Sequence, residues 1–360
     1  PDAFDQIGTK LSTLKAYSSY LYGNETQANA YNYGHMPEII LDGKGGATAK
    51  KHYCLGRISH ELIQMMPDER TALMGDDATN GGLFMFVADT ARDLSAGNLY
   101  VAKVGAGFSV DPTAAPAPIT WVHLGHATSD EIRKMANTLK PTDIMDVRKE
   151  DPFDATFTKV WLNGKANWIK VKAGMEKAAA FLETHRHAGL MGGSMGYSKM
   201  EGTTVNVRDK VAYSALAYIK DSMVKGGKGW HEDNGIALDK AVNAGGVMAL
   251  NLKRGQKDHS GKPINSEWVA ADTKALQRLD DQQLVEAGDK SREKGEERKP
   301  QDHPLQGAHA AVTVGQGAAD PTTDGRGDQR DTADQPRIAR QHRQDDGILA
   351  VPALAHHAGL

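Results

Sequence analysis

The sequence lacks the disulfide-forming cysteines that stabilise many small folds and the long apolar runs that span membranes. Cys54 is its only cysteine, so no disulfide can form within the chain. A lone cysteine suits a reducing compartment, but many exported bacterial proteins also lack disulfides, so it assigns no compartment. No run of eighteen apolar residues is present, which argues against a transmembrane helix. The sequence begins at Pro1, so we expect an incomplete N-terminus, and the missing export signal is uninformative.

Basic character and several common catalytic motifs are also missing. The net charge is -3, and lysine and arginine are scattered along the 360 residues, so we expect no nucleic acid partner. There is no P-loop, no H-E-x-x-H helix and no paired-cysteine motif, which argues against the usual nucleotide and zinc sites. The acidic segment Gly75–Gly81 lacks the spacing of an EF-hand and is better explained as a tight turn.

What is present is a regular alternation of short apolar runs and turn residues between Tyr53 and Lys103. The runs are four to six residues long and are separated by turns rich in proline, aspartate, asparagine and glycine, at 62–66, 71–74, 83–87 and 99–104. This spacing is typical of an antiparallel meander, the unit of a sandwich, a barrel or a propeller blade. The sequence therefore predicts an all-β protein.

The same order of features returns further along the chain. Glu201 lies 140 residues after Glu61, and each glutamate opens a predicted strand. An aspartate-bearing turn, a second strand and a Gly-Gly pair that begins a third strand follow in both places, with Gly245-Gly246 answering Gly81-Gly82. The pattern indicates an internal repeat, although any two antiparallel meanders share some of these features.

The chain divides into three parts by composition. Residues 1–50 are polar and glycine-rich, with a helix expected over Phe4–Tyr22, and residues 51–288 contain the meanders with helical insertions after Ser129 and over 174–189. From 289 to 360 we expect disorder or the product of a frame shift. The reason is that aromatic residues are missing after Ser291 and lysine is missing after Lys299.

Four residues are candidates for chemistry. Glu61 and Glu201 each have a cation on the same face of their predicted strand, Arg57 four residues before Glu61 and Lys199 two residues before Glu201. If each strand is the innermost of a propeller blade, the carboxylates converge on one channel and require a multivalent cation. The cations could then hold an anionic substrate such as phosphate. The alternative is a set of surface salt bridges. Likewise, Glu183 and His187 could share a metal, but a solvated i,i+4 pair is the simpler interpretation.

Several motifs resemble one known family. They are Gly56-Arg-Ile-Ser-His-Glu61, Met74-Gly-Asp-Asp77, the segment 82–89, Asp93-Leu-Ser-Ala-Gly97, and Phe181-Leu-Glu-Thr184 leading to Lys199-Met-Glu-Gly202. Together they resemble the PhoX-type alkaline phosphatases of bacteria over residues 40–290. The resemblance implies a six-bladed β-propeller, exported by the twin-arginine route to the periplasm or outside the cell. It also implies hydrolysis of small phosphomonoesters with iron and calcium.

The resemblance assigns roles and also reveals gaps. It implies that Glu61 and Glu201 bind the metals, and that Lys199 replaces an arginine that binds phosphate, with Arg57 as a second phosphate contact. The ligand cysteine and the Glu-Glu pair expected before Glu61 are not found, and Cys54 is predicted to be a buried strand residue. We therefore expect an incomplete propeller, which as a fragment could be inactive. The alternative function is a non-catalytic exported propeller that serves as a binding or surface module.

Overall fold

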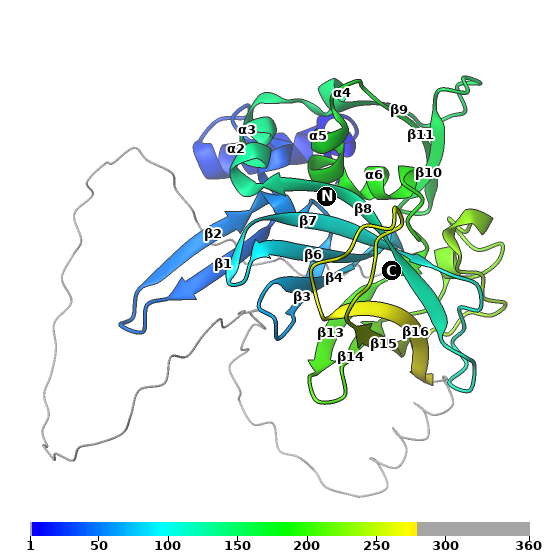
Figure 1. Ribbon diagram of the computed structural model, residues 1–360. Coiled ribbons are helices and arrows are strands. Elements are labelled where there is room, and N and C mark those ends of the chain that lie inside the picture. The colour runs from blue at the N-terminus through cyan, green and yellow to red at the C-terminus, as the bar shows by residue number, and fades with distance from the viewer. Residues whose placement is uncertain (1, 279–360) are drawn as a thin grey trace, which may run out of the picture.

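The computed structural model describes residues 2–278, which form a mostly-β fold with helices on one side (Figure 1). The predicted class, all-β with helical insertions, is confirmed. The segment 289–360, for which disorder or a frame shift was expected, lies outside the described residues.

The first predicted meander is present. Its strands pair antiparallel in the order β8-β7-β6-β4-β3. Their bounds are β3 (His60–Met65), β4 (Thr71–Asp76), β6 (Leu83–Thr90), β7 (Asp93–Val104) and β8 (Ala117–Thr128). The tight turns use a left-handed backbone at Glu69 (φ 54°) and Arg92 (φ 66°), and the two side chains form an ion pair across them.

The second predicted meander is also present. β13 (Met200–Asn206), β14 (Val211–Leu216), β15 (Gly246–Lys253) and β16 (Val269–Arg278) follow one another in sheet order. β16 pairs with β8 at two positions only, Asp272 with Pro118 and Thr273 with Ala117. This short junction connects the meanders into a nine-stranded sheet.

The two ends of this sheet come together, so the sheet nearly closes. β13 contacts both β3 and β4. The strands approach closely at Gly75, where a methyl group in place of the glycine hydrogen would lie 3.0 Å from both Cβ and the carbonyl oxygen of Met200. Between the meanders lies a core of buried side chains from both, among them Leu73, Met85, Leu216 and Met248.

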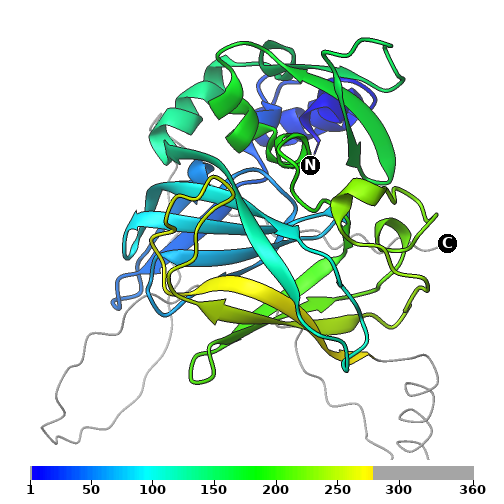
Figure 2. The ribbon, with the colours of Figure 1, turned by 45° about the vertical axis from the view of Figure 1, so that its right-hand side comes forward.

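Helices cover the other face of the first meander (Figure 2). α3 (Ser129–Thr138), α5 (Glu176–Leu182) and α6 (Thr184–Leu190) pack on it and form a second core that includes Phe84, Phe86 and Phe181. α3 begins at a capping box in which the side chains of Thr128 and Glu131 bind each other's backbone amides. Beyond α4 (Pro141–Ile144) is a small sheet of β9 (Met145–Arg148), β10 (Thr158–Leu162) and β11 (Lys165–Val171).

Several predicted bounds differ from the structure. The expected N-terminal helix is two helices, α1 (Ala3–Ile7) and α2 (Leu11–Tyr22), because the chain turns at Gly8. A hairpin of β1 (Met36–Leu41) and β2 (Ala47–His52) follows where only irregular chain was predicted. The helix over 174–189 is interrupted at Glu183, which separates α5 from α6. Cys54 is buried as predicted, but in a 3-10 turn rather than in a strand.

Candidate active site

Three of the four predicted site residues lie together where the ends of the sheet meet. Glu61 is in β3 and Glu201 is in β13, and these strands are in contact. Lys199 precedes β13, and Asp77 follows β4. We call these four residues, Glu61, Asp77, Lys199 and Glu201, the carboxylate cluster.

Lys199 is the centre of the carboxylate cluster. Its backbone has a left-handed φ of 53°, which is uncommon for a residue other than glycine. The amide of Lys199 donates to the carbonyl of Ala78 at 3.2 Å, and its own carbonyl accepts from the amide of Ala217 at 3.0 Å. The ammonium contacts Asp77 Oδ1 and lies 3.1 Å from Glu201 Oε1. The irregular backbone thus directs this side chain between two carboxylates.

The charges of the cluster influence one another. Partial burial raises the pKa of Glu61, and the negative charges of Asp77 and Glu201 raise it further against the opposing effect of Lys199. Burial alone would lower the pKa of Lys199, but its hydrogen bonds to Asp77 and Glu201 raise it overall. Lys199 is therefore firmly protonated, and three carboxylates share the field of one cation.

The donor set of the cluster bears on the metals that the resemblance implies. Its three carboxylates are the hard oxygen donors that Ca²⁺ prefers. Within residues 2–278, however, no three histidine, cysteine, aspartate or glutamate side chains converge closely enough to hold a metal ion. The thiol of Cys54 is engaged elsewhere, because it lies 3.2 Å from both the carbonyl of Leu94 and Ser129 Oγ. The donor type fits calcium, but a preassembled iron and calcium centre is not formed by the described residues.

Asp76, the neighbour of Asp77, points to the opposite side of the turn. Its Oδ1 accepts from the amide of Ser59 at 3.0 Å, and its Oδ2 lies 2.7 Å from His185 Nε2. Burial by itself would raise the pKa of Asp76, but His185 and the amide of Ser59 lower it. The two consecutive aspartates therefore serve separate sites.

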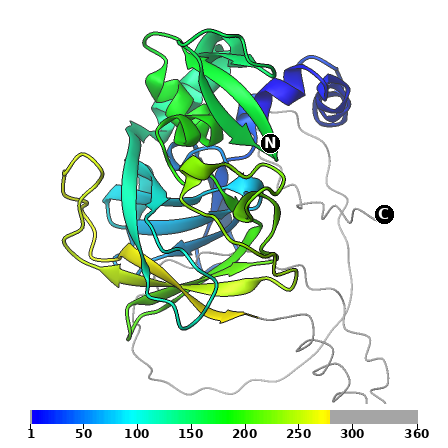
Figure 3. The ribbon, with the colours of Figure 1, turned by 90° about the vertical axis from the view of Figure 1, so that its right-hand side faces the viewer.

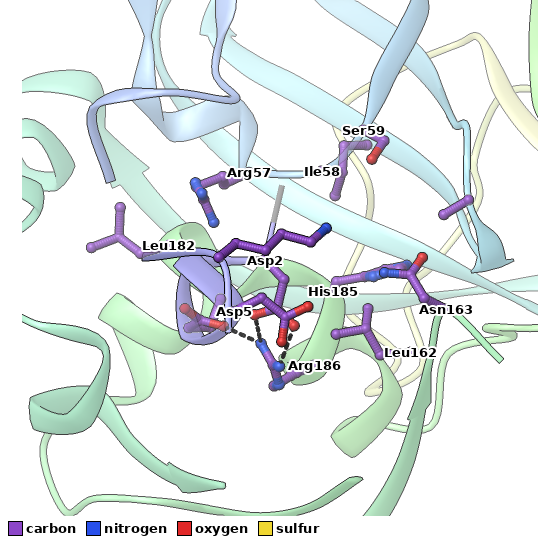
Figure 4. Close-up of a pocket in the computed structure, with 13 residues that line it drawn as sticks. Asp2, Asp5, Arg57, Ile58, Ser59, Leu162, Asn163, Leu182, His185 and Arg186 are labelled. Carbon is purple, nitrogen blue, oxygen red and sulfur yellow. Dashed lines mark hydrogen bonds and ion pairs between the residues drawn. The ribbon is translucent and has the colours of Figure 1, made fainter. Parts of the chain in front are cut away.

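His185 lines a pocket of about 250 Å³ between α1, α6 and residues 57–59, which precede β3 (Figure 4). Arg57 lies in this pocket and not in the carboxylate cluster. Its guanidinium donates to the carbonyls of Tyr33 (2.8 Å) and Ala30 (3.1 Å), and only 5% of the residue is exposed. The structure thus brings Glu61, Lys199 and Glu201 together and places Arg57 apart from them. Its predicted contact with phosphate stays a prediction.

A buried ion network forms the rear of the same pocket. Arg186 donates to both oxygens of Asp2, at 2.9 and 2.7 Å, and to Glu183 Oε2 at 2.8 Å. The hydroxyl of Tyr31 donates to the other oxygen of Glu183 at 2.8 Å. The interpretation of Glu183 and His187 as a solvated pair is wrong, because both are buried, with 4% and 5% of their surface exposed.

Sequence reasoning missed two features near the site. Asp77 was treated as a turn residue, although its place in the Met74-Gly-Asp-Asp77 motif was a usable signal. The pattern Gly192-x-Ser194-x-Gly196 resembles the elbow of a serine hydrolase. In the structure Ser194 is 1% exposed and its hydroxyl accepts from the amide of Val104 at 2.9 Å, so this serine packs and does not attack a substrate.

The comparisons with known proteins bear on this site. No curated protein sequence matches the chain. A solved structure, Pseudomonas fluorescens PhoX in complex with vanadate, a transition state analogue, is similar with 19% identity and a TM-score of 0.39. The match covers 64% of this chain and 34% of that one, so the chain spans about a third of the solved protein's length. A sequence model of the family described as alkaline phosphatase PhoX matches residues 5–342. The chain therefore belongs to the PhoX family of alkaline phosphatases.

Proposed function

We propose that the chain contributes to the hydrolysis of phosphate monoesters and that the carboxylate cluster is the place of this reaction. The observation that carries the proposal is the ammonium of Lys199 between Asp77 and Glu201, at the point where both meanders meet. Glu61 adds a third carboxylate within electrostatic reach. Membership of a phosphatase family supports the reaction class.

Lys199 is the proposed binding group for the phosphoryl oxygens. Its ammonium is partly exposed, with 29% of the side chain accessible, so a substrate can reach it. A phosphate that binds there replaces one carboxylate with another anion, and the charge of Lys199 stays compensated. Because lysine is a point charge rather than a bidentate fork, we expect weaker orientation of the phosphate than an arginine would give.

We propose that Glu61, Asp77 and Glu201 bind a hard cation after moving closer together than they lie in this structure, with calcium as the better fit to their oxygen donors and iron implied by the family alone. A bound cation would polarise the phosphoryl oxygens and neutralise developing negative charge. The residues themselves supply oxygen ligands and, through Lys199, a fixed positive charge. The proposed substrate is a small phosphomonoester.

Export to the periplasm or beyond, by the twin-arginine route, is part of the same proposal. It is supported by the family, whose members the resemblance describes as exported. Among residues 2–278, no helix is long and apolar enough to cross a membrane.

The test is hydrolysis of p-nitrophenyl phosphate by the full chain with added calcium and iron. Glu61→Gln and Glu201→Gln should each abolish turnover and weaken calcium binding measured by calorimetry, because a neutral amide cannot balance a cation. Glu25→Gln is the matched control, since Glu25 is exposed and, within residues 2–278, its one ion pair is with Lys15. Calcium binding without any turnover would instead favour the alternative, a non-catalytic binding module.

A further inference from the structure

The small sheet of β9, β10 and β11 has two unlike faces. Val160, Ile169 and Met145 are buried in the core that the helices share with the first meander. Because side chains alternate along a strand, the residues between them point away from this core. The sheet lies on the right-hand side of Figure 1 and faces the viewer in Figure 3.

The outward face combines tryptophans with cations. Across the sheet, Lys159 of β10 is paired with Trp168 of β11, and Trp168 is paired with Arg148 of β9. Paired residues in antiparallel strands share a face, so one row runs Lys159, Trp168, Arg148. Trp161 and Lys170 belong to the neighbouring rows of the same face. We call these five residues the aromatic face.

The rings and cations of the aromatic face are in contact. The ammonium of Lys159 lies 5.2 Å from the ring centre of Trp161 and 5.3 Å from that of Trp168. His231, from the loop before β15, stacks on Trp161 with ring centres 5.8 Å apart and planes inclined by 6°. Both tryptophans are partly exposed, and Lys159, Arg148 and Lys170 are exposed. The tryptophan rings therefore already contact one cation, Lys159, and one planar aromatic ring, His231.

The aromatic face also has an excess of positive charge. Among residues 2–278, Lys159, Arg148 and Lys170 form no ion pair. Three carboxylates are close: Asp146 lies on the same face and pairs with Lys172 at 3.8 Å, exposed Asp154 feels the charge of Lys170, and Asp233 acts on His231, which also feels Lys159. With Lys172 included, four cations face three carboxylates. The whole-chain charge of -3, which argued against a nucleic acid partner, does not describe this surface.

We propose that the aromatic face binds nucleotides, with a base stacked on Trp168 and phosphate oxygens held by Lys159 and Arg148. Base stacking on an aromatic side chain beside cations that follow the phosphates is the way proteins hold unpaired nucleotides without reading their sequence. The ligand is either a free nucleotide or a stretch of single-stranded nucleic acid, because both present the same base and phosphate chemistry. This site is separate from the carboxylate cluster and does not depend on phosphatase activity.

The experiment measures binding to the full chain by fluorescence anisotropy of a labelled (dT)8 oligonucleotide without terminal phosphates. Cyclic 3′,5′-thymidine monophosphate is the free-nucleotide probe. Both contain phosphodiesters, so a phosphomonoesterase leaves them intact. Trp168→Ala should weaken binding roughly tenfold, whereas Trp168→Phe retains a ring and should bind nearly as the parent chain does. The two phosphate contacts, from Lys159 and Arg148, predict a log–log salt slope of about −1.4, or about sevenfold weaker binding when sodium chloride rises from 50 to 200 mM.

The controls distinguish this site from unspecific attraction. Lys134→Ala removes an exposed lysine on α3, away from the small sheet, and should leave the affinity unchanged. Competition by the cyclic mononucleotide identifies a free-nucleotide site, and binding of the oligonucleotide alone identifies a single-strand site. Either result supports the proposal. Absence of binding by both probes, or an equal loss in Trp168→Ala and Lys134→Ala, overturns it. So does a Trp168→Phe chain that binds as weakly as Trp168→Ala while melting like the parent.

Discussion

Two cations in this molecule each lie between two carboxylates, and they differ in exposure and in the shape of the cation. Arg186 lies between Asp2 and Glu183, and none of the three side chains is more than 7% exposed. Lys199 lies between Asp77 and Glu201, and the exposed fractions are 29%, 24% and 36%. The first group ties the N-terminal segment to α6, whereas the second lies at the open junction of the meanders.

The difference separates a structural group from a candidate chemical one. The guanidinium of Arg186 uses a planar fork on Asp2 and a further contact on Glu183, whose other oxygen is bound by Tyr31. Every charge there has fixed partners that water cannot replace, so loss of one leaves the others buried and uncompensated. Around Lys199, water or a phosphate can take the place of a carboxylate. A cation between two carboxylates therefore stabilises the fold at Arg186, whereas the same arrangement at Lys199 can bind a ligand.

The largest expected effect comes from removing the buried cation. Arg186→Ala should lower the free energy of unfolding by about 3–5 kcal/mol, because Asp2 and Glu183 remain buried without their counter-charge. Urea unfolding followed by circular dichroism measures the change. Lys199→Ala is the matched variant and should cost no more than about 1 kcal/mol, since the pair is partly exposed. Equal losses in both variants would contradict the distinction between a structural and a chemical cation.

The exposed cation should control activity instead. Lys199→Ala should lower kcat/KM for p-nitrophenyl phosphate by about 100-fold, the size expected when a charged contact to a phosphoryl oxygen is lost. Lys199→Arg should keep or raise activity, because a guanidinium adds a bidentate contact. An Arg57→Lys chain tests the prediction that Arg57 contacts the phosphate. An unchanged KM would show that Arg57 does not touch the substrate. Full activity of Lys199→Ala would move the site away from the cluster.

The strands of both meanders were predictable because each apolar run and each turn is encoded locally. The runs at 71–74 and 83–87 became β4 and β6, and the matched glutamates fell on strands that meet. Asp77 was hidden because its contact with Lys199 joins residues 122 positions apart, a distance at which no local pattern acts. The tertiary fold, not the Gly75-Asp76-Asp77 turn, gives this aspartate its partner.

The sequence could not predict which charged side chains are buried. Glu183 and His187 have the spacing of a solvated helical pair. In the structure Glu183 is buried against Arg186 and Tyr31, and His187 is buried where it hydrogen-bonds the backbone of Leu124 in β8. Arg57 was assigned to the phosphate because it shares a strand face with Glu61 in an ideal strand. The chain instead bends at Gly56, where φ is 83°, and β3 begins only at His60. Alternation therefore does not hold between Arg57 and Glu61.

Acid should lower the stability of the fold through the buried side chain of His187. Burial lowers the pKa of His187 to about 4, well below the value of about 6.5 expected in the unfolded chain. Since the unfolded chain binds the proton more tightly, stability is complete above about pH 6.5 and falls as the pH drops toward 4. From pH 7 to pH 5 this one group should cost about 2 kcal/mol. His187→Gln should reduce the pH dependence of the unfolding free energy by that amount, and an unchanged slope would contradict the assignment.

The smallest expected effect concerns the contact that brings the cluster together. Gly75 lies where β4 approaches β13, and a methyl group there would be 3.0 Å from Met200 Cβ and from its carbonyl oxygen. Gly75→Ala should therefore cost about 1 kcal/mol of stability through crowding. It should also lower phosphatase activity, because the displaced strands carry Asp77 and Lys199 apart. Gly202→Ala is the control: its methyl group would meet Ala215 Cβ at 3.2 Å, within the second meander. That variant should lose similar stability and retain activity, because crowding there leaves the junction between the meanders in place. If Gly75→Ala and Gly202→Ala lose activity equally, general strain rather than the geometry of the cluster explains the loss.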